Sequence, residues 1–202
     1  MTEQFDENIK GMLAGLALGA GAAMGGDAES SNNNKPGIEQ SSEKPQLVKG
    51  KLNVEYHIIN KLMAKGLTRI AAIGVVANLK AESKLDPTTK QIARYKPLRY
   101  GPGRGLAQWE MGGRFDTDRI NLVNFAKKRG TGWTDLDTQI DFILHEMTVH
   151  PEYKRVLVLL NNAKSVEEAT KIFLTKYEKA GIPHMGKRLK FAEYLDAKYD
   201  LN

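Results

Sequence analysis

The sequence predicts a mainly α-helical domain that is interrupted by one long irregular segment. From residue 51 onward, apolar residues recur at helical spacing in successive stretches that end at Gly or Pro. Residues 88–109 lack this periodicity, and five Gly or Pro residues mark turns there. We therefore expect packed helices with a long irregular loop or a small β-hairpin beside a functional cleft.

Each expected helix is bounded by a capping residue, a Gly or a Pro. Helices are predicted over residues 53–65, from 68 to about 82, and over 116–129, 134–150, 153–160, 165–179 and 187–200. Thr68 is the expected N-cap of the second helix, and Pro87 makes its continuation past Asp86 unfavourable. Apolar residues fill much of the circumference of this helix, so it should be buried. Ser165 and Glu168 form a capping-box pattern, in which each side chain can bind the other residue's backbone N–H.

The first 50 residues differ in composition from the rest. Residues 11–26 are uncharged, small and weakly apolar, and residues 27–50 are rich in Ser, Asn, Lys, Glu and Pro, as flexible linkers are. The apolar run is shorter than the roughly 20 residues that span a bilayer. A packing or membrane-contacting segment, a disordered tail and an atypical signal therefore remain open for residues 1–26, and the main domain is expected over residues 51–202.

Charge is unevenly distributed along the chain. Residues 1–50 hold four of the 30 Lys+Arg and seven of the 24 Asp+Glu, which leaves 26 and 17, or a net charge of +9, for residues 51–202. A basic domain favours polyanions such as nucleic acid, an anionic membrane or an acidic cell wall. Five basic residues gather in the irregular segment without many aromatic residues between them, so no specific nucleic-acid partner is expected.

No metal or other cofactor is expected. The chain has no Cys, which excludes disulfides and thiolate metal sites. Its four His residues do not form a metal-binding pattern, because His145-Glu146 lacks the second His of an H-E-x-x-H motif.

Glu82 is the strongest candidate for a chemical role. It stands at the C-terminal end of the apolar second helix, where partial negative charge from the last carbonyls gathers. This charge and apolar neighbours both favour the neutral carboxylic acid, the form that can donate a proton. The competing interpretation, for a single Glu, is a solvated residue at a helix end.

An ordered set of motifs accompanies Glu82. The motifs are GVVANLKAES at 74–83, GRGLAQW at 103–109, Arg114, QIDFI at 139–143 with Glu146, FLTKYEK at 173–179, and Arg188. Together they resemble the phage tail lysozyme family of the lysozyme-like superfamily, which also holds lytic transglycosylases and goose-type lysozymes. The resemblance implies a lysozyme-like helical fold and cleavage of the β-1,4 bond between N-acetylmuramic acid and N-acetylglucosamine in peptidoglycan.

In this resemblance Glu82 protonates the leaving glycosidic oxygen. The oxocarbenium-like transition state needs a second contribution, for which three routes stay open. A second carboxylate could activate water or act as nucleophile, or Glu82 could serve first as acid and then as base. Glu110 is the favoured second catalytic carboxylate, and Asp86 and Asp116 are the alternatives.

Four neighbours of Glu82 are expected to bind substrate. Asn78 lies one helical turn before Glu82 and could bind Glu82 or a sugar, and Ser83 could cap the helix or line the cleft. Gln108 could bind an N-acetyl group, or tie the loop to a helix as a buried amide. Trp109 could stack on a sugar ring or pack in the core. The later residues Tyr177 and Glu178 are expected to be structural, packing behind the cleft.

These expectations lead to a phage virion protein, in the tail or inside the particle, that hydrolyses peptidoglycan in the host periplasm or wall during genome entry. Its expected partners are peptidoglycan, other virion proteins through residues 1–50, and a membrane surface through residues 11–26. The alternatives are a catalytically silent structural or adaptor protein of the virion, an endolysin acting at host lysis, and, last, a nucleic-acid binder.

Overall fold

The computed structural model describes residues 47–48, 51–92, 100–181 and 183–199. The segment 1–26, with its expected membrane contact, and nearly all of 27–50 lie outside these residues. At the end of the linker, β1 (Leu47–Val48) pairs antiparallel with β2 (Lys51–Leu52). Within the described residues, no helix is both long enough and apolar enough to cross a bilayer.

The described part of the chain is mainly α-helical, which confirms the predicted fold class. Its helices are α2 (Val54–Ala64), α3 (Arg69–Ser83), α4 (Leu122–Lys128), α5 (Leu136–Val149), α6 (Lys154–Asn162), α7 (Val166–Phe173), the π-helix η1 (Leu174–Glu178) and α8 (Met185–Lys198). Asn53, Thr68, Asn121, Asp135 and Ser165 act as N-caps, each accepting a hydrogen bond from a backbone N–H of the first turn.

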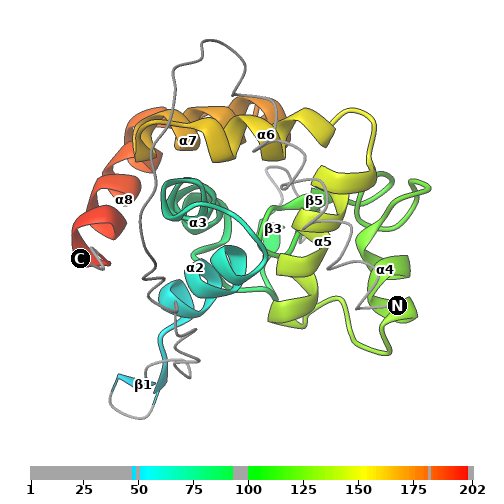
Figure 1. The fold of residues 1–202 in the computed structure, drawn as a ribbon. Coiled ribbons are helices and arrows are strands. Elements are labelled where there is room, and N and C mark those ends of the chain that lie inside the picture. Colours follow the sequence, from blue (N-terminus) through cyan, green and yellow to red (C-terminus); the bar gives the residue numbers. More distant parts are fainter. Residues whose placement is uncertain (1–46, 49–50, 93–99, 182, 200–202) are drawn as a thin grey trace, which may run out of the picture.

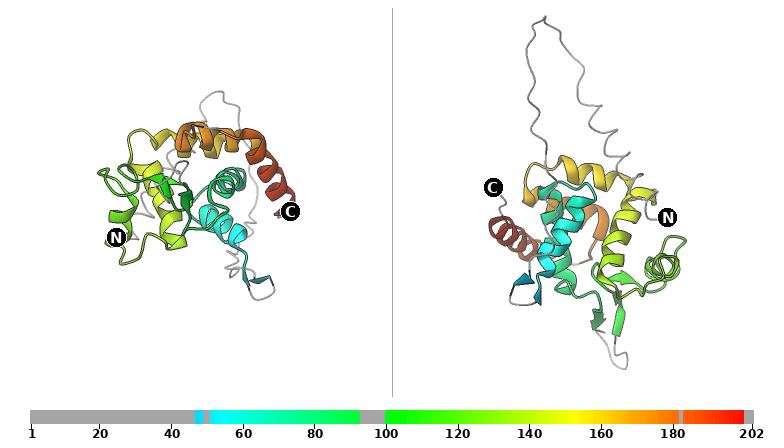
Figure 2. Two further views of the ribbon diagram at one scale, coloured as in Figure 1. Left: turned by 180° about the vertical axis from the view of Figure 1, so that it is seen from behind. Right: turned by 60° about the horizontal axis from the view of Figure 1, so that its bottom comes forward.

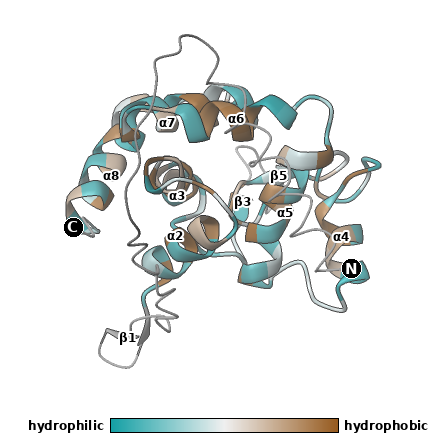
Figure 3. Ribbon diagram, viewed as in Figure 1, coloured by the Kyte–Doolittle hydropathy of each residue, from teal (hydrophilic) through white to brown (hydrophobic). Residues whose placement is uncertain are grey.

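Helix α3 lies at the centre of the molecule, with α2, α7 and α8 packed against it (Figure 1). All residues from Ala71 to Leu79 are buried, because apolar or small side chains cover the whole circumference of the helix. Figure 3 shows hydrophobic segments on α2 and α3 where they face the interior. Helix α7 approaches closely at Gly74, where an added Cβ would lie 2.6 Å from the Cβ of Ala169.

The irregular segment contains a small antiparallel sheet, so the β-hairpin alternative is correct. Its strand order is β3 (Lys90–Ile92), β4 (Tyr100–Arg104) and β5 (Trp109–Glu110). In the β4–β5 pair, Gly103 faces Glu110 and Arg104 faces Trp109. The strands lie between α3 and α5 in Figure 1 and in the left view of Figure 2. The sheet therefore leads directly from the end of α3 to the second group of helices.

Two predicted helices differ from the observed ones. The helix expected over 116–129 begins only at Leu122, because the carbonyl of Gly113 accepts three N–H groups, those of residues 116, 117 and 118, and holds them in turns. The helix expected over 165–179 leaves the α form after Phe173 and continues as the π-helix η1. At its start the capping box is only half formed, since Glu168 binds the backbone N–H of Lys164.

Candidate active site

Glu82 lies in the last turn of α3, where the chain leaves the buried helix. Two residues after Glu82, Lys84 adopts the left-handed conformation, with a φ of 57°, and caps the helix. The side chain of Glu82 is 22% exposed. Its carboxyl group can therefore meet a ligand from solvent while it keeps partners inside the protein.

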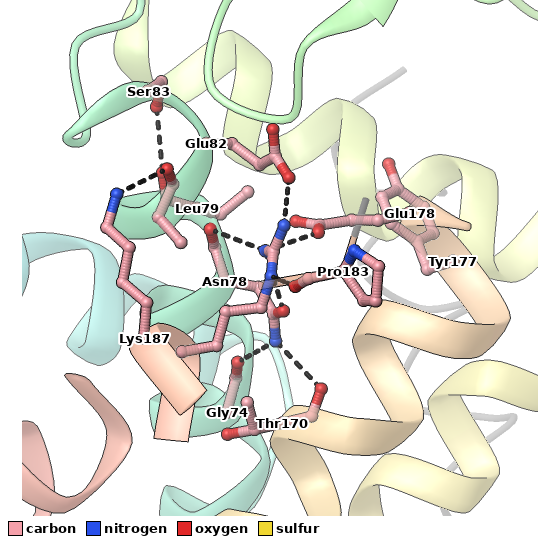
Figure 4. A network of polar contacts seen from close by, with 12 residues as sticks. Gly74, Asn78, Leu79, Glu82, Ser83, Thr170, Tyr177, Glu178, Pro183 and Lys187 are labelled. Atoms are coloured by element: carbon pink, nitrogen blue, oxygen red, sulfur yellow. Dashed lines mark hydrogen bonds and ion pairs between the residues drawn. The ribbon is translucent and has the colours of Figure 1, made fainter. Parts of the chain in front are cut away.

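Arg188, from α8, is the inner partner of Glu82. Figure 4 shows its other partners, Glu178, Asn78 and Pro183, gathered below Glu82. Its side chain is only 2% exposed and makes five hydrogen bonds. Nη2 donates to Glu82, and Nη1 donates to Glu178 at 2.7 Å and to the side chain and carbonyl of Asn78 at 3.0 and 3.2 Å. Nε donates to the carbonyl of Pro183 at 2.8 Å. A planar guanidinium suits this arrangement, because its donors diverge at fixed angles.

Asn78 supports Arg188 and cannot reach a substrate in this structure. Its side chain is fully buried, and Nδ2 donates to the carbonyls of Gly74 at 2.7 Å and Thr170 at 3.0 Å. Its Oδ1 is thereby turned toward Arg188. The expected substrate-binding role of Asn78 is corrected to an indirect one, since the same helical face that carries Glu82 is covered by α7 and α8 at this level.

Glu178 is the carboxyl group that the structure adds to this site. Its side chain is only 3% exposed, at the end of η1. Burial raises the pKa of Glu178 to about 8; Arg188 opposes the shift, and the charge of Glu82 and its hydrogen bond with Glu178 add to it. Two carboxyl groups therefore meet at one guanidinium, and Glu178 favours its protonated form near neutral pH.

The other carboxylates considered from the sequence lie elsewhere. Asp86 accepts the backbone N–H and the hydroxyl of Thr88 at 2.8 and 2.7 Å, and Asp116 accepts the N–H of Gly112 at 2.8 Å. Both carboxylates thus hold turns, as Asp side chains commonly do. Glu110 is an exposed residue of β5. Within the described part of the chain, none of the three is a polar partner of Glu82.

Ser83 and Gln108 both hold local backbone structure. Ser83 is 4% exposed, and its hydroxyl donates to the carbonyl of Leu79 at 3.0 Å, so it stabilises the helix end and does not line a cleft. Gln108 has a φ of 50°, and its Nε2 donates to the carbonyl of Gly105 at 2.7 Å. Gln108 as a whole is half-buried.

Trp109 belongs to the core, which corrects its expected role as a platform for a sugar ring. It is 2% exposed, and its ring meets that of Phe142 edge-on with centroids 5.5 Å apart. Its indole N–H donates to Glu146 at 3.0 Å, and the same fully buried carboxylate binds Arg114 at 2.7 Å and the hydroxyl of Tyr177 at 2.5 Å. Burial of the charged pair is tolerated because its polar atoms have partners. The cluster ties β5 and α5 to η1.

Comparison with known proteins identifies the family of the chain. A family model described as phage tail lysozyme matches residues 53–199, which is most of the chain. The chain belongs to the phage tail lysozyme family. Morphogenesis protein 1 of Bacillus phage B103 is a more distant relative, 28% identical over 148 residues. The match covers 71% of this chain but only 38% of that protein, so the chain spans well under half of its relative's length.

In this member of the family, sequence reasoning missed the contribution of two late motif residues, Glu178 and Arg188, to the site. Glu178 was expected to pack behind the cleft, and Arg188 had no assigned role. A signal for their role was present in the sequence, because the late motifs contain an acidic and a basic residue, Glu178 and Arg188, in addition to the early Glu82. The sequence alone did not reveal that α8 turns this arginine toward the end of α3.

Proposed function

We propose that this chain is a virion-associated peptidoglycan hydrolase that opens the host wall during genome entry. The bond it would cleave is the β-1,4 bond between N-acetylmuramic acid and N-acetylglucosamine. One observation carries the proposal: Glu82 is a partly exposed carboxyl group at the end of a buried helix, held in place by the buried Arg188. Membership of the phage tail lysozyme family supports the same chemistry.

Glu82 would act as the general acid. Its protonated carboxyl donates the proton to the glycosidic oxygen as the bond to the anomeric carbon breaks, which leaves an oxocarbenium-like centre. The resulting carboxylate can then remove a proton from the attacking hydroxyl, either that of water or that of the substrate itself. This route needs no second carboxylate on the far face of the sugar, and it suits a site in which Asp86 and Asp116 are engaged in turns.

The charge of the domain fits such a substrate. Residues 51–202 carry a net charge of +9, and cell walls present anionic polymers. Long-range attraction of this kind would raise the local concentration of wall polymers near the protein, with an effect that salt weakens.

The printed name of the B103 relative favours a second candidate, a structural protein of the particle whose site is silent. Both candidates place the chain in the virion. They differ in one respect, which is turnover of peptidoglycan, and an activity assay therefore separates them.

The test is clearance of purified peptidoglycan, followed as turbidity and in a zymogram. The full chain should clear the substrate, and Glu82→Gln, which keeps the shape but cannot donate the proton, should lose about 10²-fold or more of the rate. Glu167→Gln on α7, an exposed residue paired with Lys171, is the matched control and should match the parent protein. Full activity in Glu82→Gln would refute the assignment of the acid, and no clearance by the parent protein would favour the silent structural role.

The mass of the products decides the second step. A reducing end shows attack by water, and a 1,6-anhydro end shows attack by the substrate's own hydroxyl. Glu110→Gln tests the carboxylate favoured from the sequence, and near-parental turnover in this variant would exclude it from the reaction.

A further inference from the structure

We propose that Glu178 is a positioning and proton-holding residue for Glu82: the two carboxyl groups share one proton, and Arg188 binds the single negative charge that remains. The shared proton stands on the structure alone, and its catalytic consequence rests on the proposed function of Glu82.

The hydrogen bonds at Glu178 carry the first step of the argument. Oε2 accepts from Arg188 at 2.7 Å. Oε1 is fully buried, and no donor of the described residues reaches it as long as Glu178 and Glu82 are both ionised. A buried carboxylate oxygen without a donor is strongly unfavourable. A proton on Glu178 removes the deficit, because its O–H can then donate to the neighbouring Glu82.

The charges around Glu178 lead to the same result. The cations that face it are Arg188 from α8 and Arg114 from the segment after β5. Arg114 is already bound to both oxygens of Glu146, a fully buried carboxylate of α5. One available guanidinium therefore faces two carboxyl groups, those of Glu178 and Glu82. Two ionised carboxylates would leave an uncompensated charge beside the buried Arg188 and Glu178, whereas one proton makes the trio neutral.

Neighbouring residues do not supply the missing positive charge. Lys179, next in the chain, forms its ion pair with Glu152, and Lys187 donates to the carbonyl of Ala81 at 3.5 Å. The pKa of Glu178, raised to about 8 by burial, agrees with a proton held near neutral pH.

Glu178 is the last of the five residues of the π-helix η1. The following Lys179 is left-handed, with a φ of 51°, and caps the turn. Single turns of π-helix are rare and occur frequently at functional sites. Here the turn places two adjacent side chains on different buried partners, Tyr177 on Glu146 and Glu178 on Arg188. An element of this kind indicates that the position of Glu178 is specified rather than incidental.

The proton balance of the step is simple. As the glycosidic C–O bond breaks, its electron pair stays on the leaving oxygen, which takes the proton from Glu82. This is the one proton that the pair shares, so Glu82 and Glu178 are then both carboxylates around Arg188, opposite the positive charge that develops at the anomeric carbon. When the attacking hydroxyl forms its bond to the anomeric carbon, its proton passes to Glu82 and back to Glu178. The charge of the trio changes by one unit in the first step and returns in the second.

The direct test is a titration of the glutamate carboxyl carbons by ¹³C NMR, with assignment from Glu82→Gln and Glu178→Gln. In the parent protein the pair should keep one proton above pH 7, although an ordinary glutamate is ionised well below that. Glu178→Gln places an amide donor toward Glu82 and should abolish this neutral-pH step. Complete ionisation of both carboxyl groups by pH 6 would overturn the proposal, whether or not the protein is an enzyme.

The rate of peptidoglycan turnover provides a second test of the proposal. Glu178→Gln should keep its fold and KM, lose about 10- to 100-fold in kcat, and shift the basic limb of its pH–rate profile to lower pH. Glu167→Gln should change none of these. A parental rate and profile in Glu178→Gln would overturn the catalytic part of the proposal. Absence of turnover in the parent protein would instead refute the proposed function and leave the NMR titration to decide the shared proton.

Discussion

Arg188 donates a hydrogen bond from Nη2 to Oε1 of Glu82, although the two residues stand 106 positions apart in the sequence. The contact joins α8 to the end of α3 and leaves the arginine 2% exposed. A buried guanidinium has a fixed fork of donors, so it sets the direction of the carboxyl group as well as its charge.

Arg188→Lys tests this relationship. The lysine keeps the charge but cannot reach all the acceptors of Arg188, which leaves buried oxygens unpaired and should lower the free energy of unfolding by about 1–3 kcal/mol. Urea denaturation measures the change. Arg155→Lys on α6, an exposed position, is the control and should stay within about 0.5 kcal/mol. Equal stability of the two variants would mean that the geometry of Arg188 is not required.

Gly74→Ala should destabilise the contact between α3 and α7. The new Cβ would lie 2.6 Å from the Cβ of Ala169 and 2.8 Å from the backbone nitrogen of Thr170, so the helices must separate. We expect a loss of about 1–3 kcal/mol. Gly186→Ala in α8 is the control, because its Cβ meets nothing within 4 Å and should stabilise by about 0.4–1 kcal/mol. Thermal denaturation of both variants checks the opposite signs.

Trp109→Phe separates a core role from sugar binding. The change removes the indole donor to Glu146 and should cost about 1–3 kcal/mol of stability, because a buried carboxylate loses a partner. KM for peptidoglycan should not change, since the ring is 2% exposed. A several-fold rise in KM with stability unchanged would restore the platform interpretation.

The stability of the parent protein should fall with rising pH relative to that of Glu178→Gln. The pKa of Glu178 is about 8 in the folded chain and ordinarily 4.5, so the folded state binds more protons between these values. Its contribution is full below about pH 4.5 and is lost as the pH rises through about 8, with a slope of at most about 1.4 kcal/mol per pH unit.

Urea denaturation of both proteins at pH 5, 6, 7 and 8 checks this difference. Subtraction removes contributions that the proteins share, including that of His145, whose pKa is lowered by burial and which acts in the opposite direction. Parallel pH curves for the two proteins would show that Glu178 does not hold its proton near neutral pH.

Local patterns were sufficient to predict much of the helical fold. The apolar stripe of 53–65 and the cap at Thr68 predicted α2 and the start of α3, because helix periodicity and capping depend on residues a few positions apart. The same reasoning failed at 116–121, where turns around Gly113 compete with helix formation. It also missed η1, since π-helical geometry has no simple periodic signal.

The sequence by itself determined that a buried helix ends at Glu82, and its ordered motifs indicated the family that the comparisons confirmed. Only the tertiary structure decided what surrounds that carboxyl group. It placed Trp109 in the core and brought Glu178 and Arg188 to Glu82. The reason is physical: burial and ion pairing depend on how distant helices pack, and no local spacing encodes that packing.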